Sequence, residues 1–317
     1  MFKRPSPVLA LLVVLGLALP ASVCADTSYS GGSFSIGVNA HLATGAGLEK
    51  MTAMGASSVR ADAIWSNIER TKGIFDFAAL DAFVAQARAQ GLSVYLNLAG
   101  TPAWETAGGR YQAVPRVTDW TNFVSRVARR YGTRVALYEI WNEPNIPAFF
   151  DGSPAQYLQT ILKPGYLAIK AVNSRLIVAG PEVTITPTVD PRPFLAVLTR
   201  SNGLHYADVV SFHAYAGDLT TFRSLVSKIL AVLPSGKPIY LTEFGWDAKT
   251  LGEAVQASRL ASTIAYLAGL GRIRVALIYE LIDDPTITAY QLGLLRSDGS
   301  ARPAVAAVRK AIAHYRR

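Results

Sequence analysis

The sequence predicts an α/β fold, a single (β/α)₈ TIM barrel, on three observations. Short apolar runs rich in β-branched residues alternate with longer runs of helical period from residue 34 onward. Eight such short runs occur, and polar side chains follow nearly every one of them. Strands that alternate with helices pair in parallel through right-handed crossovers. Eight units over this length fit a closed barrel better than an open doubly wound sheet or an open sheet with a separate helical piece.

The expected elements follow one another without a linker. The eight strands are predicted at residues 34–39, 58–62, 93–98, 135–141, 176–180, 209–213, 239–243 and 274–279. Helices are predicted at residues 77–90, 118–131, 154–173, 220–233 and 251–270. In the first of these, Leu80, Phe83, Val84 and Ala87 share one face and Gly91 provides a C-terminal stop. No internal repeat or low-complexity tract interrupts the series, so one catalytic domain is expected over residues 32–317.

The first 25 residues have the layout of a secretory signal peptide. Lys3 and Arg4 precede an uncharged run over residues 8–19, and small residues lead to an expected cleavage site after Ala25. The run is short for a membrane span, so no membrane anchor is expected in the mature form. Cys24, the only cysteine, would leave with this segment, which excludes disulfides and thiolate metal sites. We therefore expect a periplasmic or secreted protein that acts as a monomer.

The net charge of +9 raises the question of a polyanionic partner. The arginines at positions 126, 129, 130 and 134 cluster at the end of a predicted helix, where cations interact favourably with the helix dipole. No nucleic-acid partner is expected. No Gly-rich phosphate loop follows the first strand, which argues against a dinucleotide cofactor. The four histidines do not have a metal-ligand spacing, so neither a cofactor nor a metal is predicted.

Two glutamates end predicted strands on opposite sides of the barrel. Glu143 follows the fourth strand within Trp141-Asn142-Glu143-Pro144, and Glu243 ends the seventh before Phe244-Gly245-Trp246. The chemistry of such barrels collects at the carboxyl ends of the strands, so the two carboxyl groups should approach each other across the mouth. A pair of carboxyl groups is what glycoside hydrolysis requires. Glu143 is predicted to be the general acid/base and Glu243 the nucleophile.

Other strand-end residues are expected to support this pair. Tyr215 should donate a hydrogen bond to Glu243 and keep it ionised. Glu139 lies about 13 Å below Glu143 on the same strand and needs a cation such as Arg60. The residues expected to line the sugar site are Asn142, His213, Tyr215, Arg60, His41, Trp104, Trp246 and Tyr279. Weaker carboxylate candidates, expected to bind sugar hydroxyls, are Asp62, Glu182, Glu280, Asp283 and Asp284.

These motifs resemble the retaining glycoside hydrolase superfamily of (β/α)₈ barrels that includes the cellulase and β-xylosidase families. Trp141-Asn142-Glu143-Pro144 is similar to the acid/base signature and Thr242-Glu243-Phe244-Gly245-Trp246 to the nucleophile signature. Further similarities lie at residues 59–62, 65–69, 73–76, 102–104, 211–215, 279–284 and 292–295. The set looks most like the xylosidase-type family and its bacterial branch of exopolysaccharide hydrolases, although Tyr279 stands where many cellulase-like relatives carry tryptophan.

The resemblance implies retaining hydrolysis of β-glycosidic bonds in a polysaccharide, which a bacterial exopolysaccharide would supply. The alternative is a barrel that binds polysaccharide or serves as an export scaffold without turnover. Such decayed barrels usually lose one catalytic carboxylate, and both remain here. The sugar, its linkage and the choice between internal and terminal cleavage are left open by the sequence.

Overall fold

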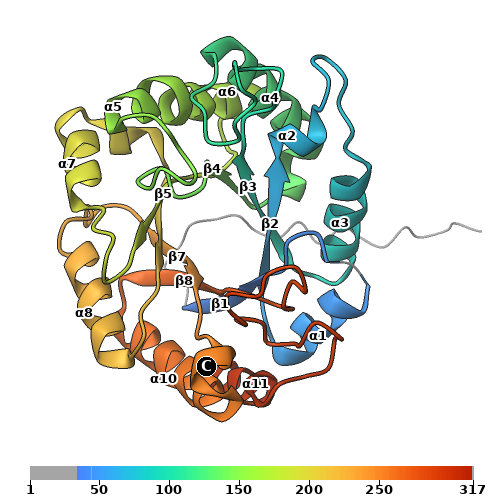
Figure 1. Cartoon of the computed structure of the whole chain (residues 1–317), viewed down its shortest axis with the longest axis vertical. Helices are drawn as coiled ribbons and strands as arrows, with labels where there is room; N and C mark the ends of the chain where they lie inside the picture. Colours follow the sequence, from blue (N-terminus) through green and yellow to red (C-terminus); the bar gives the residue numbers. More distant parts are fainter. Residues whose placement is uncertain (1–33, 44, 316–317) are drawn as a thin grey trace, which may run out of the picture. The chain divides into compact units, whose positions relative to one another are not determined.

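A computed structural model describes residues 34–43 and 45–315 of the chain. Their centre is a closed barrel of eight parallel strands in sequence order (Figure 1). The strands are β1 (Ser35–Asn39), β2 (Ser58–Ile64), β3 (Ser93–Ala99), β4 (Leu137–Ile140), β5 (Val178–Ile185), β6 (Val209–Ala214), β7 (Ile239–Phe244) and β8 (Ile273–Ile278). All eight lie where the sequence predicts strands, and the predicted barrel is confirmed.

The barrel closes between its first and last strands. β1 pairs with β2 on one side and with β8 on the other, with Val38 opposite Ile278. Gly37 makes this closure sterically feasible, because a Cβ atom there would come within 2.2 Å of the Ser58 side chain and 2.5 Å of Leu277. A side chain at position 37 would therefore force the first strand away from both neighbours.

Helices surround the strands as an outer ring (Figure 1). They are α1 (Ala46–Met54), α2 (Trp65–Ile68), α3 (Ala78–Ala89), α4 (Val117–Tyr131), α5 (Pro154–Gln156), α6 (Lys163–Val172), α7 (Arg192–Arg200), α8 (Leu219–Leu230), α9 (Ala248–Leu251), α10 (Glu253–Leu270) and α11 (Pro303–Tyr315). A π-helical segment, Tyr157–Leu162, joins α5 to α6, and short 3₁₀ turns occur at Gly132–Arg134 and Gly203–Tyr206. No helix among these described residues is long and apolar enough to cross a bilayer.

Two elements differ from the prediction. The strand expected to end at Gly180 continues to Ile185 as β5, with an irregular register between Pro181 and Val183. Proline is unusual inside a strand, which is why the sequence suggested an end there. The helix expected over 154–173 is α5, the π segment and α6 in succession.

The predicted signal segment, residues 1–25, lies outside the described residues and stays a prediction.

The apolar core has two parts. The larger lies between strands and helices, where each amphipathic helix buries one face against the barrel. The smaller fills the interior of the barrel, where Tyr95, Leu137, Val209, Val275 and Leu277 pack together, with Tyr240 stacked on Tyr95. Above this apolar interior the inward-pointing residues become charged, and these residues form the site described next.

Candidate active site

The backbone at the carboxyl end of the barrel takes conformations that side chains rarely adopt. Glu143 has φ 41°, Glu182 φ 53°, His41 φ 48° and Trp141 φ 71°. Non-glycine residues in this left-handed region cost free energy and occur mostly where function requires a particular geometry. His41, Trp141 and Glu143 lie just beyond β1 and β4, and Glu182 lies at the irregularity within β5, so the backbone distortion is concentrated around the carboxylate site.

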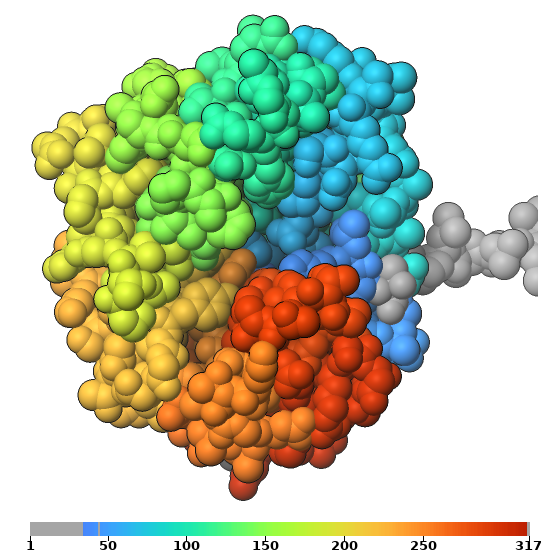
Figure 2. All heavy atoms as spheres, in the orientation of Figure 1, coloured from blue at the N-terminus to red at the C-terminus, as the bar shows by residue number. Residues whose placement is uncertain are grey.

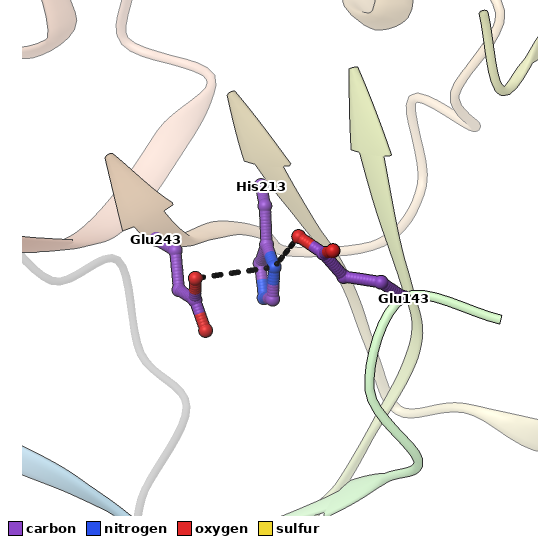
Figure 3. Close-up of side chains that lie close together, drawn as sticks. All are labelled: Glu143, His213 and Glu243. Atoms are coloured by element: carbon purple, nitrogen blue, oxygen red, sulfur yellow. Dashed lines mark hydrogen bonds and ion pairs between the residues drawn. The ribbon is translucent and has the colours of Figure 1, made fainter. Parts of the chain in front are cut away.

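Glu143 and Glu243 meet across the mouth, as the sequence predicted, with His213 of β6 between them (Figure 3). Nδ1 of His213 lies 2.8 Å from Oε1 of Glu143 and 3.5 Å from Oε2 of Glu243. One ligand atom from each of the three residues lies within 4.8 Å of the others. Both glutamates are 8% exposed, enough to meet a substrate from the mouth.

Each oxygen of Glu243 has a donor. Nη1 of Arg60 lies 2.8 Å from Oε1, and the Tyr215 hydroxyl donates to Oε2 at 2.7 Å. Burial raises the pKa of Glu243 and the charge of Glu143 adds to this, whereas His213, Arg60 and the Tyr215 hydrogen bond act in the opposite direction. These partners orient the carboxylate and offset part of the effect of burial, but the net shift of the Glu243 pKa is upward.

Arg60 is buried on β2 and serves as the cation of the barrel interior. Its Nε pairs with Glu139, as the sequence predicted, and its Nη1 also donates to Oδ1 of Asn39 at 2.9 Å. Nη2 donates to Oδ1 of Asn142 at 3.3 Å. Arg60 is 2% exposed and its guanidinium is used within the protein, so the structure leaves it almost no surface for the predicted contact with substrate. Burial raises the pKa of Glu139 to about 8, with Arg60 opposing the effect.

His213 is fully buried, which also corrects its predicted contact with substrate. Its Nε2 lies 3.2 Å from Oε2 of Glu182. Burial alone would lower the pKa of His213, but the charge of Glu243 and the hydrogen bonds to Glu143 and Glu182 outweigh it and raise the pKa to about 10. The imidazole therefore carries a positive charge at neutral pH, with an N–H on each ring nitrogen.

Glu182 belongs to the same network of charged side chains, through a contact with His213 that the sequence analysis did not predict. The sequence suggested that it binds sugar hydroxyls, but it is 0% exposed and its side chain accepts hydrogen bonds from Ser211 and from Thr242 at 2.7 Å. The bulge at Pro181/Val183 turns it inward. The one signal in the sequence was the Gly180-Pro181-Glu182 run, where proline in a strand indicates a bulge as well as an end.

A second charged group lies on the mouth between β1, β2 and β8. His41 bridges Asp62 and Glu280, with Nδ1 3.0 Å from Oδ2 of Asp62 and Nε2 2.9 Å from Oε2 of Glu280. These two hydrogen bonds raise the pKa of His41 to about 10, although its side chain is 46% exposed. The ring of Tyr279 packs edge-on against both His41 and Tyr215, so these rings form one wall of the site.

The two tryptophans predicted to line the sugar site, Trp104 and Trp246, differ in burial. Trp246 is 1% exposed and its Nε1 donates to Thr263 at 3.0 Å, so it is a core residue and not a sugar platform. Trp104 is half-buried, lies edge-on against Trp65, and its Nε1 donates to the carbonyl of Glu69 at 2.6 Å. Asp283, a weaker carboxylate candidate, is buried against Arg302 and is structural.

The mouth is bordered by two long segments. In Figure 2 the green surface after β4 and the red surface after β8 meet around a depression over the barrel centre. A pocket of about 520 Å³ begins at Pro144 and Asn145, directly after Glu143. Its other walls are Arg110, Ile146, Pro147, Phe150, Asp151, Gly152, Pro154 and Phe194. A combination of apolar rings and polar edges of this kind suits a carbohydrate.

Glu143, His213 and Glu243 are close enough together to enclose a metal ion. Within this group Glu243 already pairs with the buried cation Arg60, at 2.8 Å from Nη1 to Oε1.

The fold and this arrangement of carboxyl groups define a protein of the glycoside hydrolase class. Residues 52–233, more than half of the chain, match the family described as Glycosyl hydrolases family 39. The chain belongs to this family.

Individual relatives agree with the assignment. A β-xylosidase of Caldicellulosiruptor saccharolyticus is 28% identical over 160 residues, which is 46% of this chain and 32% of that protein. The chain thus matches about a third of the length of that relative.

Solved structures share the fold. A family 39 glycoside hydrolase from Bacteroides cellulosilyticus WH2 has a TM-score of 0.72 and 22% identity, covering 90% of this chain and 64% of its own. A monomeric β-xylosidase from Caulobacter crescentus CB15 has a TM-score of 0.66 and 21% identity, covering 87% of this chain and 67% of its own.

Proposed function

We propose that this protein is a retaining glycoside hydrolase that cleaves β-glycosidic bonds of a polysaccharide by double displacement. Glu143 is the general acid/base and Glu243 the nucleophile. The observation that carries the proposal is the approach of one carboxylate oxygen of Glu143 to one of Glu243 within 4.8 Å. Retaining enzymes hold the two groups about 5–5.5 Å apart, whereas inverting enzymes leave roughly 6.5–9.5 Å for a water molecule.

In the first step Glu143 donates its proton to the glycosidic oxygen while Glu243 attacks the anomeric carbon. The bond between that carbon and the leaving oxygen breaks, and a covalent glycosyl ester forms on Glu243. Arg60 and Tyr215 support the attack, because they hold both oxygens of Glu243 in place and stabilise its charge. Oε1 of Glu143 accepts from His213, so Oε2 is the oxygen that carries the proton to substrate.

In the second step Glu143, now ionised, removes a proton from water, and the hydroxide oxygen attacks the anomeric carbon. Glu243 leaves, and the sugar is released with its original β configuration. Asn142 is half-buried and its Oδ1 is held by Arg60, so its amide NH₂ is the group available to a sugar 2-hydroxyl. Such a hydrogen bond strengthens as positive charge develops on the ring.

The polymeric substrate is supported by the pocket that follows Glu143, where residues of a leaving-group chain would rest. Ile146 and Pro147 offer apolar surface to sugar C–H groups, whereas Phe150 and Phe194 are buried in the wall of the pocket. The predicted signal segment supports a periplasmic or secreted location, where a bacterial exopolysaccharide, the substrate that the family resemblance implies, would be accessible. Release of reducing ends across a panel of β-glucan, xylan, mannan and bacterial exopolysaccharides will identify the polymer. Binding without any release would favour the non-catalytic alternative.

The two roles are tested by paired substitutions assayed on an activated aryl glycoside. Glu243→Ala should abolish turnover and regain it with azide, giving the α-azide. Glu143→Ala should spare the first step and give the β-azide, because the glycosyl ester on Glu243 still forms. The opposite stereochemical outcomes would exchange the two roles.

A further inference from the structure

We infer that Glu182 is a positioning residue that holds His213 as an imidazolium, so that its Nδ1–H donates to Oε1 of Glu143 and the acid proton is confined to Oε2. This inference rests on the proposed function, because it assigns a task to Glu182 within that reaction. Glu182 does not touch substrate, since it is 0% exposed. It acts on the acid/base through the imidazole between them.

The backbone around Glu182 is shaped for this contact. The register of β5 is irregular between Pro181 and Val183, and Glu182 itself has φ 53°. Together these features turn the Glu182 side chain toward the barrel interior. The same residue also holds Glu143 through its main chain, because the Glu143 N–H donates to the Glu182 carbonyl at 3.1 Å. One residue thus fixes the backbone of the acid/base and, through His213, its side chain.

The hydrogen bonds at Glu182 require a carboxylate. Ser211 donates to Oε1, Thr242 donates to Oε2 at 2.7 Å, and Nε2 of His213 lies 3.2 Å from Oε2. Three donors converge on two oxygens, and a protonated carboxyl group would have to place a fourth hydrogen among them. Burial raises the pKa of Glu182, but His213, Arg60 and Ser211 outweigh it and the net shift is downward.

The ionised groups around His213 come from every strand packed against it. Glu182 comes from β5, Glu143 follows β4 and Glu243 comes from β7, while Arg60 on β2 contributes an opposing positive charge beside Glu243. Glu143 and Glu243 both face Nδ1, and Glu182 faces Nε2. Glu182 is therefore the partner that keeps a proton on the far side of the ring.

The protonation of this ring decides which oxygen of Glu143 delivers the proton. With both nitrogens protonated, Nδ1 can only donate, so a protonated Glu143 must carry its hydrogen on Oε2. A neutral ring with its proton on Nε2 would present a lone pair at Nδ1. Glu143 would then donate its proton to His213, where the substrate cannot receive it. Loss of the Glu182 charge favours a neutral ring. In Glu182→Gln the amide oxygen can still accept from the Nε2–H, so the remaining ring proton can stay on Nε2 and this second arrangement becomes accessible.

The test is the ¹⁵N spectrum of the His213 ring as a function of pH in the full-length protein. The sequence contains four histidines, so signals can be assigned from single substitutions. In the wild type we expect both ring nitrogens to be protonated at pH 7, with a titration midpoint near 10. In Glu182→Gln we expect the midpoint to fall by roughly 2 pH units. The rate of glycosyl-ester formation should fall roughly 10- to 100-fold.

Thr242→Val is the matched control, because it removes one hydroxyl from Glu182 and leaves the charge in place. It should keep His213 doubly protonated at pH 7. An unchanged midpoint in Glu182→Gln overturns the inference. If that variant does not fold, the wild type decides alone: a singly protonated ring at pH 7 overturns the inference and a doubly protonated ring supports it. The spectra do not depend on turnover, so a wild type that hydrolyses nothing would overturn only the proposed function.

Discussion

The barrel interior has two layers that differ in almost every physical property. In the lower layer Tyr95, Leu137, Val209 and Val275 pack as an apolar core. In the upper layer Arg60, Glu139, Glu182, His213, Glu143 and Glu243 form a network in which each side chain contacts at least one of the others. β4 and β6 carry residues of both layers. The comparison teaches that the lower layer supplies rigidity, whereas the upper layer has the strained backbone and buried charge that catalysis requires.

The largest effect is expected from removing the cation of the upper layer. Arg60→Met leaves Glu139 and Glu243 buried without their shared partner, which should cost about 3–5 kcal/mol of unfolding free energy. kcat/KM should also fall by roughly 10²- to 10³-fold, because Glu243 loses a donor. Denaturant unfolding measures the unfolding free energy, and steady-state kinetics measure kcat/KM. Arg309→Met on the exposed face of α11 is the control, and equal effects in both variants would contradict the comparison.

A cavity in the lower layer should separate stability from chemistry. Leu137→Ala removes a buried side chain two residues below Glu139 and should cost about 2–5 kcal/mol. At temperatures where the variant is folded, kcat/KM and its pH profile should match the wild type, because the upper network keeps its contacts. A changed pH profile would show that the two layers are coupled more tightly than their contacts imply.

The charge of His213 makes stability depend on pH. Its folded-state pKa of about 10 lies above the ordinary value of 6.5, so its protonation stabilises the fold fully below pH 6.5. That contribution is lost as pH rises through 10. We expect the unfolding free energy to fall between pH 6.5 and 10, with a contribution from His213 on the order of 2 kcal/mol. In His213→Gln the unfolding free energy should fall less steeply over the same pH range. An equally steep profile in the variant would assign the decline to other groups.

The smallest effect is expected from the loss of one hydrogen bond to Glu243, the proposed nucleophile. Tyr215→Phe removes the donor to Oε2 of Glu243, a bond that lowers the pKa of this carboxyl group. The acidic limb of kcat/KM should therefore move to higher pH, and kcat should fall roughly 10-fold. Tyr95→Phe makes the same chemical change in the lower layer and should leave the pH profile in place. An equal shift of the acidic limb of kcat/KM in both variants would contradict the difference between the two layers.

Sequence reasoning succeeded where periodicity and strand ends carry the information. Strand order predicts the closure of the barrel and the meeting of Glu143 with Glu243. The parity of side chains predicts the Arg60–Glu139 and Tyr215–Glu243 contacts. These features depend on the regular part of the backbone, which a hydrophobic pattern describes well.

The errors lie where the backbone leaves that regularity or where burial decides a role. Glu182 was misassigned because the fifth strand was expected to end at Gly180, whereas β5 continues through a bulge that turns this side chain inward. Trp246 and His213 were predicted to meet substrate because they follow strand ends, but both point into the protein. How far a side chain reaches into solvent depends on the segments that cover it, which a single sequence does not place.

The central claim is double displacement by Glu143 and Glu243, and the anomeric configuration of the first product tests it most directly. An activated aryl β-glycoside hydrolysed by a large amount of enzyme can be followed by proton NMR before the product sugar equilibrates. Because two inversions at the anomeric carbon restore its configuration, the β anomer should appear first and the α anomer only later, by mutarotation. Initial formation of the α anomer would mean a single displacement by water, and would contradict the account.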